Sequence, residues 1–252
     1  SGTPFTNQYS LSFDGTDDEL TIPQGTFNLG SGLFTFSLWF NADSLNTYNC
    51  LFRINSSTGI SCTSFIRSNG EIWLSNWSYN QLVSTGNTIN TGAWNHLAYV
   101  KSTTGSTGTV TIYYNGSSIA SGSIPSGSNF GSETGTSAIG RSYSAEYPFD
   151  GKIDEFAFWN SALSASDIAT LRGGASAGTV GVPADISSLN PVGWWRMGDG
   201  SDGSGNADGT VVGGLPQIYN VAEDGSGNRI TGIDGSMTNI SSPNGIVSDV
   251  PS

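Results

Sequence analysis

The segment Leu33–Asn41 reads LFTFSLWFN, and large apolar side chains occupy every second position from Phe34 to Phe40. One parity carries Phe34, Phe36, Leu38 and Phe40, and the other carries Thr35, Ser37 and Trp39. Because successive side chains of a strand point to opposite faces of its sheet, the segment predicts a strand with one face in a core. Its other face is expected to be open or half-open, as in a two-sheet sandwich.

Short runs with the same alternation recur along the chain, and Gly, Asn, Ser and Pro separate them. The clearest are Tyr9–Asp14, Cys50–Ile54, Ile60–Arg67, Glu71–Trp77, Trp94–Lys101, Thr109–Asn115, Ser137–Arg141 and Lys152–Asn160. The 252 residues include 35 Gly for tight turns, and 12 Phe, 9 Tyr and 7 Trp for a core. The sequence therefore predicts an all-β fold, a two-sheet antiparallel sandwich.

One short helix is predicted after the last of these runs. Ser164 stands three residues before Asp167, which is the spacing of a capping box. Ile168 and Leu171 follow on one helical face, and a Gly-Gly pair then ends the helix.

The domain organisation is inferred from a change of composition near residue 173, where small residues and Gly begin to dominate. Residues 1–172 are predicted to form the sandwich and residues 173–190 a linker. The C-terminal segment 191–252 contains a last strand candidate, VGWWRM at 192–197, which is expected to complete the same sandwich. A loop-rich extension is predicted to follow it.

The charge balance is acidic, with 20 Asp and Glu against 8 Lys and Arg and a formal net charge of -12. This balance argues against a nucleic-acid partner, because no basic run is present to neutralise phosphates. No membrane span is predicted either, since no stretch approaches the roughly 20 apolar residues that a span requires.

Three segments resemble a known family. They read YSLSFDGTDDEL at 9–20, WNHLA at 94–98 and FDGKIDEFAFWN at 149–160, and the last leads into ALS at 162–164. This set is similar to the laminin-G-like, concanavalin A-like jelly-roll family over residues 9–172. The resemblance implies a jelly-roll sandwich with one short helix. It says less about function, because proteins that share a fold can carry different functional sites.

The order of one motif departs from that family. Members often open with a strand similar to WWRMGD, whereas here this stretch comes late, at 194–199. Two alternatives follow. The strand closes its own sandwich, which close termini make easy and which we favour, or it pairs with a neighbouring subunit and so favours oligomers.

The resemblance also implies a structural Ca²⁺ ion, with Asp14, Asp17, Asp154 and the carbonyl of Gly15 as candidate ligands. Asp154 has the parity of Phe156, so it is expected to point to the core side, where a carboxylate needs compensation. The alternative is that Asp14 and Asp17 shape an Asx-turn while Asp154 accepts backbone hydrogen bonds.

Cys50 and Cys62 flank the turn-rich stretch NSSTG at 55–59. If the strands on either side pair about that turn, the two cysteines lie nearly opposite and within disulfide reach. Two buried free thiols are the alternative, because the sequence alone does not determine the pairing.

Signatures of catalysis are sparse. His96 is the only histidine, and its alternation with Trp94 and Ala98 indicates a histidine packed within a strand. Asp154 and Glu155 are adjacent, so on a regular strand they face opposite ways. No strand then presents the two carboxylates that a retaining glycoside hydrolase places on one face. We therefore expect the chain not to be an enzyme, with a glycoside hydrolase as the catalytic alternative.

Four aromatic residues in polar loops are candidate ligand-binding residues, since an aromatic face stacks on the apolar C–H surface of a sugar. They are Trp77, Tyr79, Tyr143 and Tyr147. The alternative is that these rings only pack their loops onto the sandwich.

The resulting hypothesis is a non-catalytic binding module that recognises a glycan or a protein at an exposed surface. A virion decoration or tail-associated protein is its concrete version, since relatives with a late GWWRMGDG segment resemble parts of virion or cell-surface assemblies. Such a module would lie outside the cell or on a virion surface. The alternative is a purely structural subunit of a virion or another assembly, whose C-terminal strand contacts other subunits in an oligomer.

Overall fold

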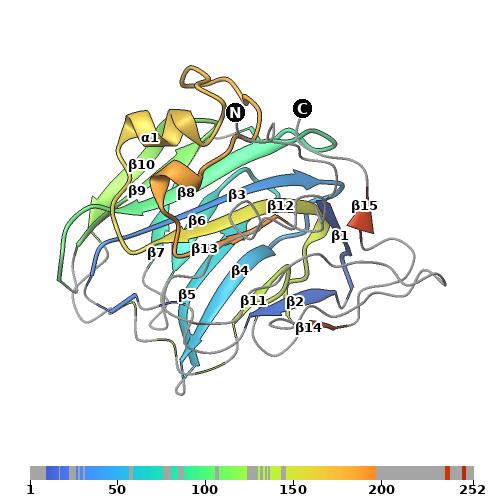
Figure 1. The fold of residues 1–252 in the computed structure, drawn as a ribbon. Coiled ribbons are helices and arrows are strands. Elements are labelled where there is room, and N and C mark those ends of the chain that lie inside the picture. The colour runs from blue at the N-terminus through green and yellow to red at the C-terminus, as the bar shows by residue number, and fades with distance from the viewer. Residues whose placement is uncertain are drawn as a thin grey trace.

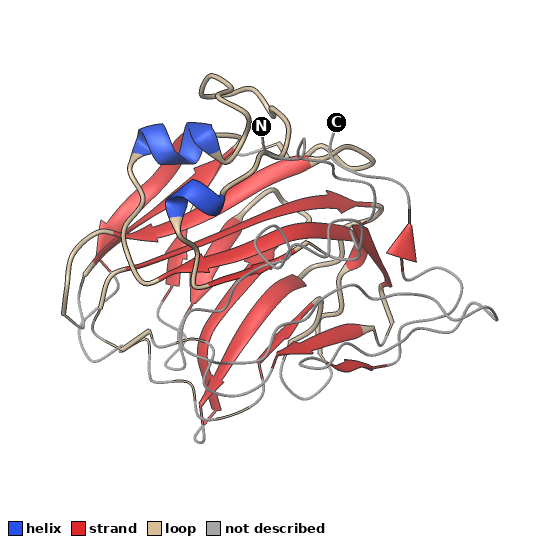
Figure 2. Ribbon diagram, in the orientation of Figure 1, coloured by secondary structure: helices blue, strands red, loops and turns tan. Residues whose placement is uncertain are grey.

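The computed structural model describes residues 10–16, 18–22, 27, 29–30, 32–56, 59–75, 81–84, 88–105, 108–123, 130, 133, 135, 137–142, 146–196, 236–238 and 246–247. Two β-sheets face each other, and one α-helix and one 3-10 helix lie against the outside of the sandwich (Figures 1 and 2). The predicted all-β sandwich of two antiparallel sheets with one short helix is confirmed.

Sheet A contains, in spatial order, β10 (Ser117–Ser123), β9 (Thr109–Tyr114), β8 (Asn95–Lys101), β3 (Phe34–Ala42), β12 (Asp150–Trp159), β1 (Ser10–Asp14) and β15 (Ile246–Val247), and β13 (Gly193–Trp195) also pairs with β12. Sheet B contains β14 (Ser236–Thr238), β2 (Glu19–Ile22), β11 (Ser137–Ile139), β4 (Asn49–Ser56), β5 (Gly59–Ile66), β6 (Ile72–Ser75) and β7 (Gln81–Val83). Neighbouring strands run antiparallel, so hairpins and longer crossovers connect them.

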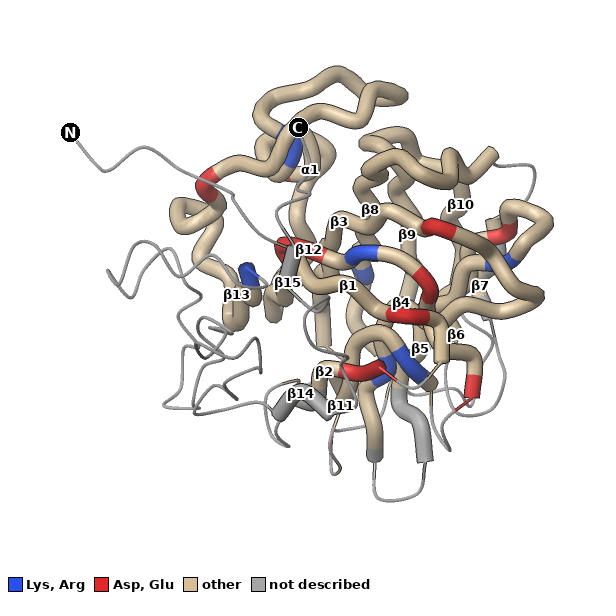
Figure 3. Tube along the Cα trace, turned by 90° about the vertical axis from the view of Figure 1, so that its right-hand side faces the viewer, with Lys and Arg blue, Asp and Glu red and all other residues tan. Residues whose placement is uncertain are grey.

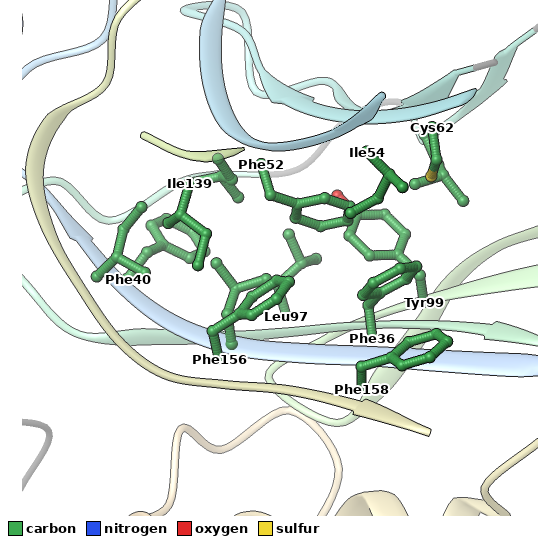
Figure 4. Close-up of a cluster of buried hydrophobic side chains, with 14 of the residues drawn as sticks. Phe36, Phe40, Phe52, Ile54, Cys62, Leu97, Tyr99, Ile139, Phe156 and Phe158 are labelled. Carbon is green, nitrogen blue, oxygen red and sulfur yellow. The ribbon is translucent and has the colours of Figure 1, made fainter. Parts of the chain in front are cut away.

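The core lies between the two sheets and is rich in aromatic rings. The Phe36 ring of β3 lies 4.8 Å from that of Phe52 on β4 and 4.9 Å from that of Phe158 on β12, centroid to centroid. Figure 4 shows side chains from both sheets pointing into this shared space. Full burial of each such side chain contributes about 1.5–3 kcal/mol, so these contacts hold the sheets face to face.

The outer face of sheet A differs from the sequence prediction, which left it open or half-open. All nine residues of β3 are buried. A second apolar cluster covers this face, in which Trp159 of β12 meets Ile168 of the helix α1 (Ala165–Thr170) and Ile186. Leu189, in the 3-10 helix η2 (Ser187–Leu189), packs against the same cluster. The stretch predicted as a linker therefore packs on the sandwich.

The helix α1 begins as its sequence predicts. The side chain of Ser164 accepts a hydrogen bond from the backbone of Asp167, and the Asp167 carboxylate accepts one from the backbone of Ser164. Just beyond the helix, Arg172 is buried and donates to the carbonyls of Asn115 and Ala175, which ties this end of the helix to the turn between β9 and β10. Among the described residues, no helix is both long and apolar enough to cross a membrane.

The late strand β13 pairs with β12 of its own sandwich, with Trp195 opposite Phe156. The side chain of Trp194 donates a hydrogen bond to Glu155, and Arg196 Nε lies 3.3 Å from Glu155 Oε1. β13 and β1 pair with the same edge of β12. β1 pairs with the first residues of β12, and β13 pairs with residues nearer its end. The structure therefore shows the first of the two pairing alternatives, while the division of the chain into domains stays a prediction.

Candidate binding face

The outer face of sheet B carries a group of aromatic side chains. Phe65 on β5 and Trp73 on β6 lie directly opposite each other. Ile72, the neighbour of Trp73, belongs to the core, so alternation turns Trp73 outward. Tyr48, just before β4, and Tyr147, just before β12, join them. We call Tyr48, Phe65, Trp73 and Tyr147 the aromatic cluster.

The rings of the aromatic cluster lie in mutual contact. Tyr48 is 5.4 Å from Trp73 and 5.1 Å from Tyr147, and Tyr147 is 5.7 Å from Phe65, centroid to centroid. These separations are typical of favourable aromatic pairs. Tyr147 is 41% exposed, and its backbone has a φ of 52°. Its carbonyl accepts a hydrogen bond from Cys50 N at 2.9 Å, which helps to hold this uncommon conformation at the cluster.

An ion pair lies against the same rings. The Arg67 guanidinium carbon is 4.7 Å from the Tyr48 ring centroid and 4.9 Å from that of Trp73, within the range of cation–π contacts. Arg67 Nη1 donates to Glu71 Oε2 at 2.7 Å, and Trp73 Nε1 donates to the same oxygen at 3.0 Å. The hydrogen bond from Arg67 holds the pKa of the Glu71 carboxyl below its usual value. The face thus combines rings with a balanced pair of charges, Arg67 and Glu71.

Of the four aromatic residues predicted to bind a ligand, Tyr147 lies in this cluster. Trp77, Tyr79 and Tyr143 lie outside the described residues. The sequence reasoning missed the other ring-bearing members, Tyr48, Phe65 and Trp73, and the ion pair beside them. A usable signal was present, because the apolar neighbours of Trp73 predict that its ring points away from the core.

The comparison with protein families settles what kind of sandwich this is. The family described as the concanavalin A-like lectin/glucanases superfamily matches residues 14–169. The chain belongs to this superfamily. The match covers more than half of the 252 residues and confirms the laminin-G-like, concanavalin A-like resemblance of the sequence motifs.

Solved structures share the superfamily fold. One is a heptameric SAP-like pentraxin from Limulus polyphemus, with a TM-score of 0.54 and 20% identity over 66% of this chain and 82% of the pentraxin. Another is a putative carbohydrate binding protein from Bacteroides ovatus, with a TM-score of 0.60 and 17% identity over 99% of this chain and 62% of that one. At such identities the likeness concerns the fold alone. No curated protein matches the chain.

Two of the residues proposed as Ca²⁺ ligands, Asp14 and Asp154, lie apart along the edge of β12. Asp14 lies opposite Asp150 on β12, and Asp154 is four positions farther along that strand, about 13 Å away at ~3.3 Å per residue. Asp14 Oδ1 accepts a hydrogen bond from Thr16 N at 2.8 Å, as an Asx-turn requires. Asp17 lies outside the described residues, and a Ca²⁺ ion near Asp14 stays a prediction.

The predicted direction of Asp154 is wrong, because a β-bulge follows it. Asp154 pairs with Trp39, and the next pair is Ala157 with Ser37, so β12 has one more residue than β3 here. Asp154 thus lies on the covered outer face, as does Glu155, which has a φ of 49° and bonds to Trp194. The two carboxylates do not face opposite ways, but both are buried under the helical layer and its connections.

Of the two alternatives for the cysteines, the structure shows the free thiols. Cys50 lies opposite Phe65, whereas Cys62 lies opposite Ile54. The three residues from Cys62 to Phe65 span about 10 Å, beyond the roughly 7 Å that a disulfide can bridge between Cα atoms. Both cysteines are buried free thiols, and burial raises the pKa of each above its ordinary value.

His96 is fully buried on the outer face of sheet A, and its Nε2 lies 2.8 Å from Ser37 Oγ. Burial and, to a smaller extent, the charge of Arg172 lower the pKa of His96 from 6.5 to about 3. An imidazole with so low a pKa is a weak base, so it does not activate Ser37 as a nucleophile. A pocket beside Ser37 and Trp39 holds about 10 Å³, enough for one water molecule.

Proposed function

We propose that this chain is a non-catalytic carbohydrate-binding module whose ligand lies on the aromatic cluster. The observation that carries the proposal is the gathering of four rings, one of them 41% exposed, on the outer face of sheet B. The helix and the connection after it occupy the outer face of sheet A instead (Figure 2). Surface rings stack on the C–H faces of sugars, which are apolar, while nearby polar groups bond the hydroxyls.

The electrostatics of the face support a sugar more than a catalytic substrate. The buried His96, Asp154 and Glu155 lie on the opposite sheet, under side chains that exclude a polysaccharide. Glu71, beside the rings, bonds to Arg67 and Trp73, and its low pKa keeps it ionised rather than available as a general acid. The name of the Bacteroides ovatus structure, a putative carbohydrate binding protein, agrees with the proposal but concerns that protein.

Binding to a glycan array, followed by titration calorimetry with the best glycan, tests the proposal. Tyr147→Ala should weaken binding at least tenfold, since loss of a central aromatic contact costs about 1.4 kcal/mol or more. Tyr113→Ala is the matched control and should leave binding unchanged, because this partly buried tyrosine packs against the second apolar cluster, on the opposite sheet. Equal affinities of Tyr147→Ala and the unaltered chain would refute the site.

The setting of the module is part of the proposal. We infer a location outside the cell, where polysaccharides are met, and a virion surface stays a prediction. The alternative is a purely structural subunit whose C-terminal strand contacts other subunits, but β13 pairs with β12 of its own sandwich. Light scattering that showed a stable oligomer without glycan binding would favour the structural alternative.

A further inference from the structure

We propose that the Arg67–Glu71 pair makes this face selective for neutral glycans and excludes uronic, sialic and sulfated ones. The inference rests on the proposed function and specifies the ligand class of the same site. It starts from the position of the pair, whose cation touches two rings of the aromatic cluster and whose carboxylate bonds the Trp73 indole.

The charges of the Arg67–Glu71 pair disfavour an anionic sugar. Arg67 contacts two of the cluster rings, and Glu71 balances its charge at 2.7 Å. An anionic sugar would have to compete with Glu71 for the guanidinium and would face a carboxylate beside it. The chain also carries a formal net charge of -12, which opposes the approach of a polyanion. Figure 3 shows acidic and basic positions interspersed over the described part of the chain.

The Arg67–Glu71 pair keeps hydrogen-bonding capacity for sugar hydroxyls. A guanidinium has five N–H donors, and the bonds of Arg67 engage Nε with the Thr47 carbonyl and Nη1 with Glu71. A carboxylate has about four acceptor positions, and the bonds from Arg67 and Trp73 both reach Oε2 of Glu71. The two side chains are 24% and 23% exposed. They therefore offer a donor and an acceptor together, which suits neighbouring sugar hydroxyls, because each hydroxyl both donates and accepts.

The Arg67 side chain is preorganised for binding. Long charged side chains lose much rotational freedom when a ligand fixes them, which reduces affinity. Here the rings of Tyr48 and Trp73, the Thr47 carbonyl and Glu71 already hold Arg67 in place. The donor and acceptor are thus set beside the stacking surface before a sugar arrives.

The experiment compares glycans that share a backbone and differ in charge. One pair is polygalacturonan and its fully methyl-esterified form, and an array of neutral glycans with their sialylated or sulfated counterparts extends the comparison. The unaltered chain should bind the neutral member of a recognised pair at least tenfold more tightly. Glu71→Gln keeps a hydrogen-bond acceptor but removes the negative charge that balances Arg67. It should therefore reduce this preference for the neutral glycan at least tenfold. Binding of the anionic member by this variant should weaken with added salt.

Asp185→Asn is the matched control, because it removes the same unit of charge from an exposed position on the sheet A side. It should leave the preference unchanged. Arg67→Gln should weaken neutral binding without any gain of anionic binding, and this second variant reports on the pair even if Glu71→Gln fails to fold. Tight binding of anionic glycans by the unaltered chain would overturn this inference alone, whereas binding of no glycan would overturn the proposed function with it.

Discussion

Acidification should destabilise this protein through His96. The side chain is fully buried, its Nε2 lies 2.8 Å from Ser37 Oγ, and its Nδ1 has no hydrogen-bond partner. Burial, with the charge of Arg172, lowers its pKa from 6.5 to about 3 in the folded chain. Below pH 6.5 the unfolded chain therefore binds a proton that the folded chain does not, and the free energy of unfolding falls as the pH falls towards 3.

The size of the effect follows from the two pKa values. At pH 4.5 the unfolded histidine is two pH units below its pKa, and the folded one is still neutral. At about 1.36 kcal/mol per unit, the loss relative to pH 7.5 is about 2.7 kcal/mol. This figure depends little on the folded pKa, provided that it stays below 4.5.

Chemical unfolding at pH 7.5 and pH 4.5, followed by tryptophan fluorescence, measures this loss. Carboxylates titrate over the same range, so His96→Gln is the reference, because it cannot be protonated but keeps the other groups. The unaltered chain should lose about 2.7 kcal/mol more than the variant between the two pH values. Equal losses in both proteins would show that His96 is protonated in the folded chain, and so would refute its burial as a neutral group.

Three further predictions concern stability and covalent state. Arg196→Ala should lower the free energy of unfolding by about 3–5 kcal/mol, because it removes one member of the buried Arg196–Glu155 ion pair, and denaturant titration measures this. Gly116→Ala should also destabilise the chain, by about 1–3 kcal/mol in calorimetry, since φ is 76° and the new Cβ would lie 2.1 Å from Arg172 Nη2. A thiol assay in denaturant should find both cysteines free with and without reductant, and fewer thiols without reductant would contradict the β4–β5 register.

Strands with large apolar side chains at every second position could be predicted from the sequence. β3 and β8 begin and end within one residue of the predicted runs, because each buries a continuous set of rings and aliphatic side chains. β10 reads SSIASGS and was not predicted, since its small polar residues carry little alternation. Its position depends on hydrogen bonds to β9, which is a property of the assembled sheet.

Register could not be predicted in the same way. The β4–β5 hairpin pairs Ser56 with Gly59, whereas Cys50 and Cys62 would lie opposite each other only if the turn were centred on residue 56, so the cysteines do not meet. The bulge after Asp154 likewise shifts every later side chain of β12 by one position. A period of two shows neither where a turn is centred nor whether a strand holds one extra residue, so neither pairing could be predicted from the sequence.

The position of the helical layer decides which polar groups can meet a ligand. Asp154, Glu155 and His96 were the groups that most suggested chemistry, but they lie on the sheet A face that α1 and the following connection cover. The rings of the aromatic cluster come from loops and strands of sheet B, where the sequence contains no second helix signal to cover them. Tyr48 and Tyr147 are far apart in sequence, and their rings meet where Cys50 N bonds the Tyr147 carbonyl. The proposed binding face is therefore a product of topology, and substitutions that alter that pairing should affect glycan binding even though they lie outside the rings.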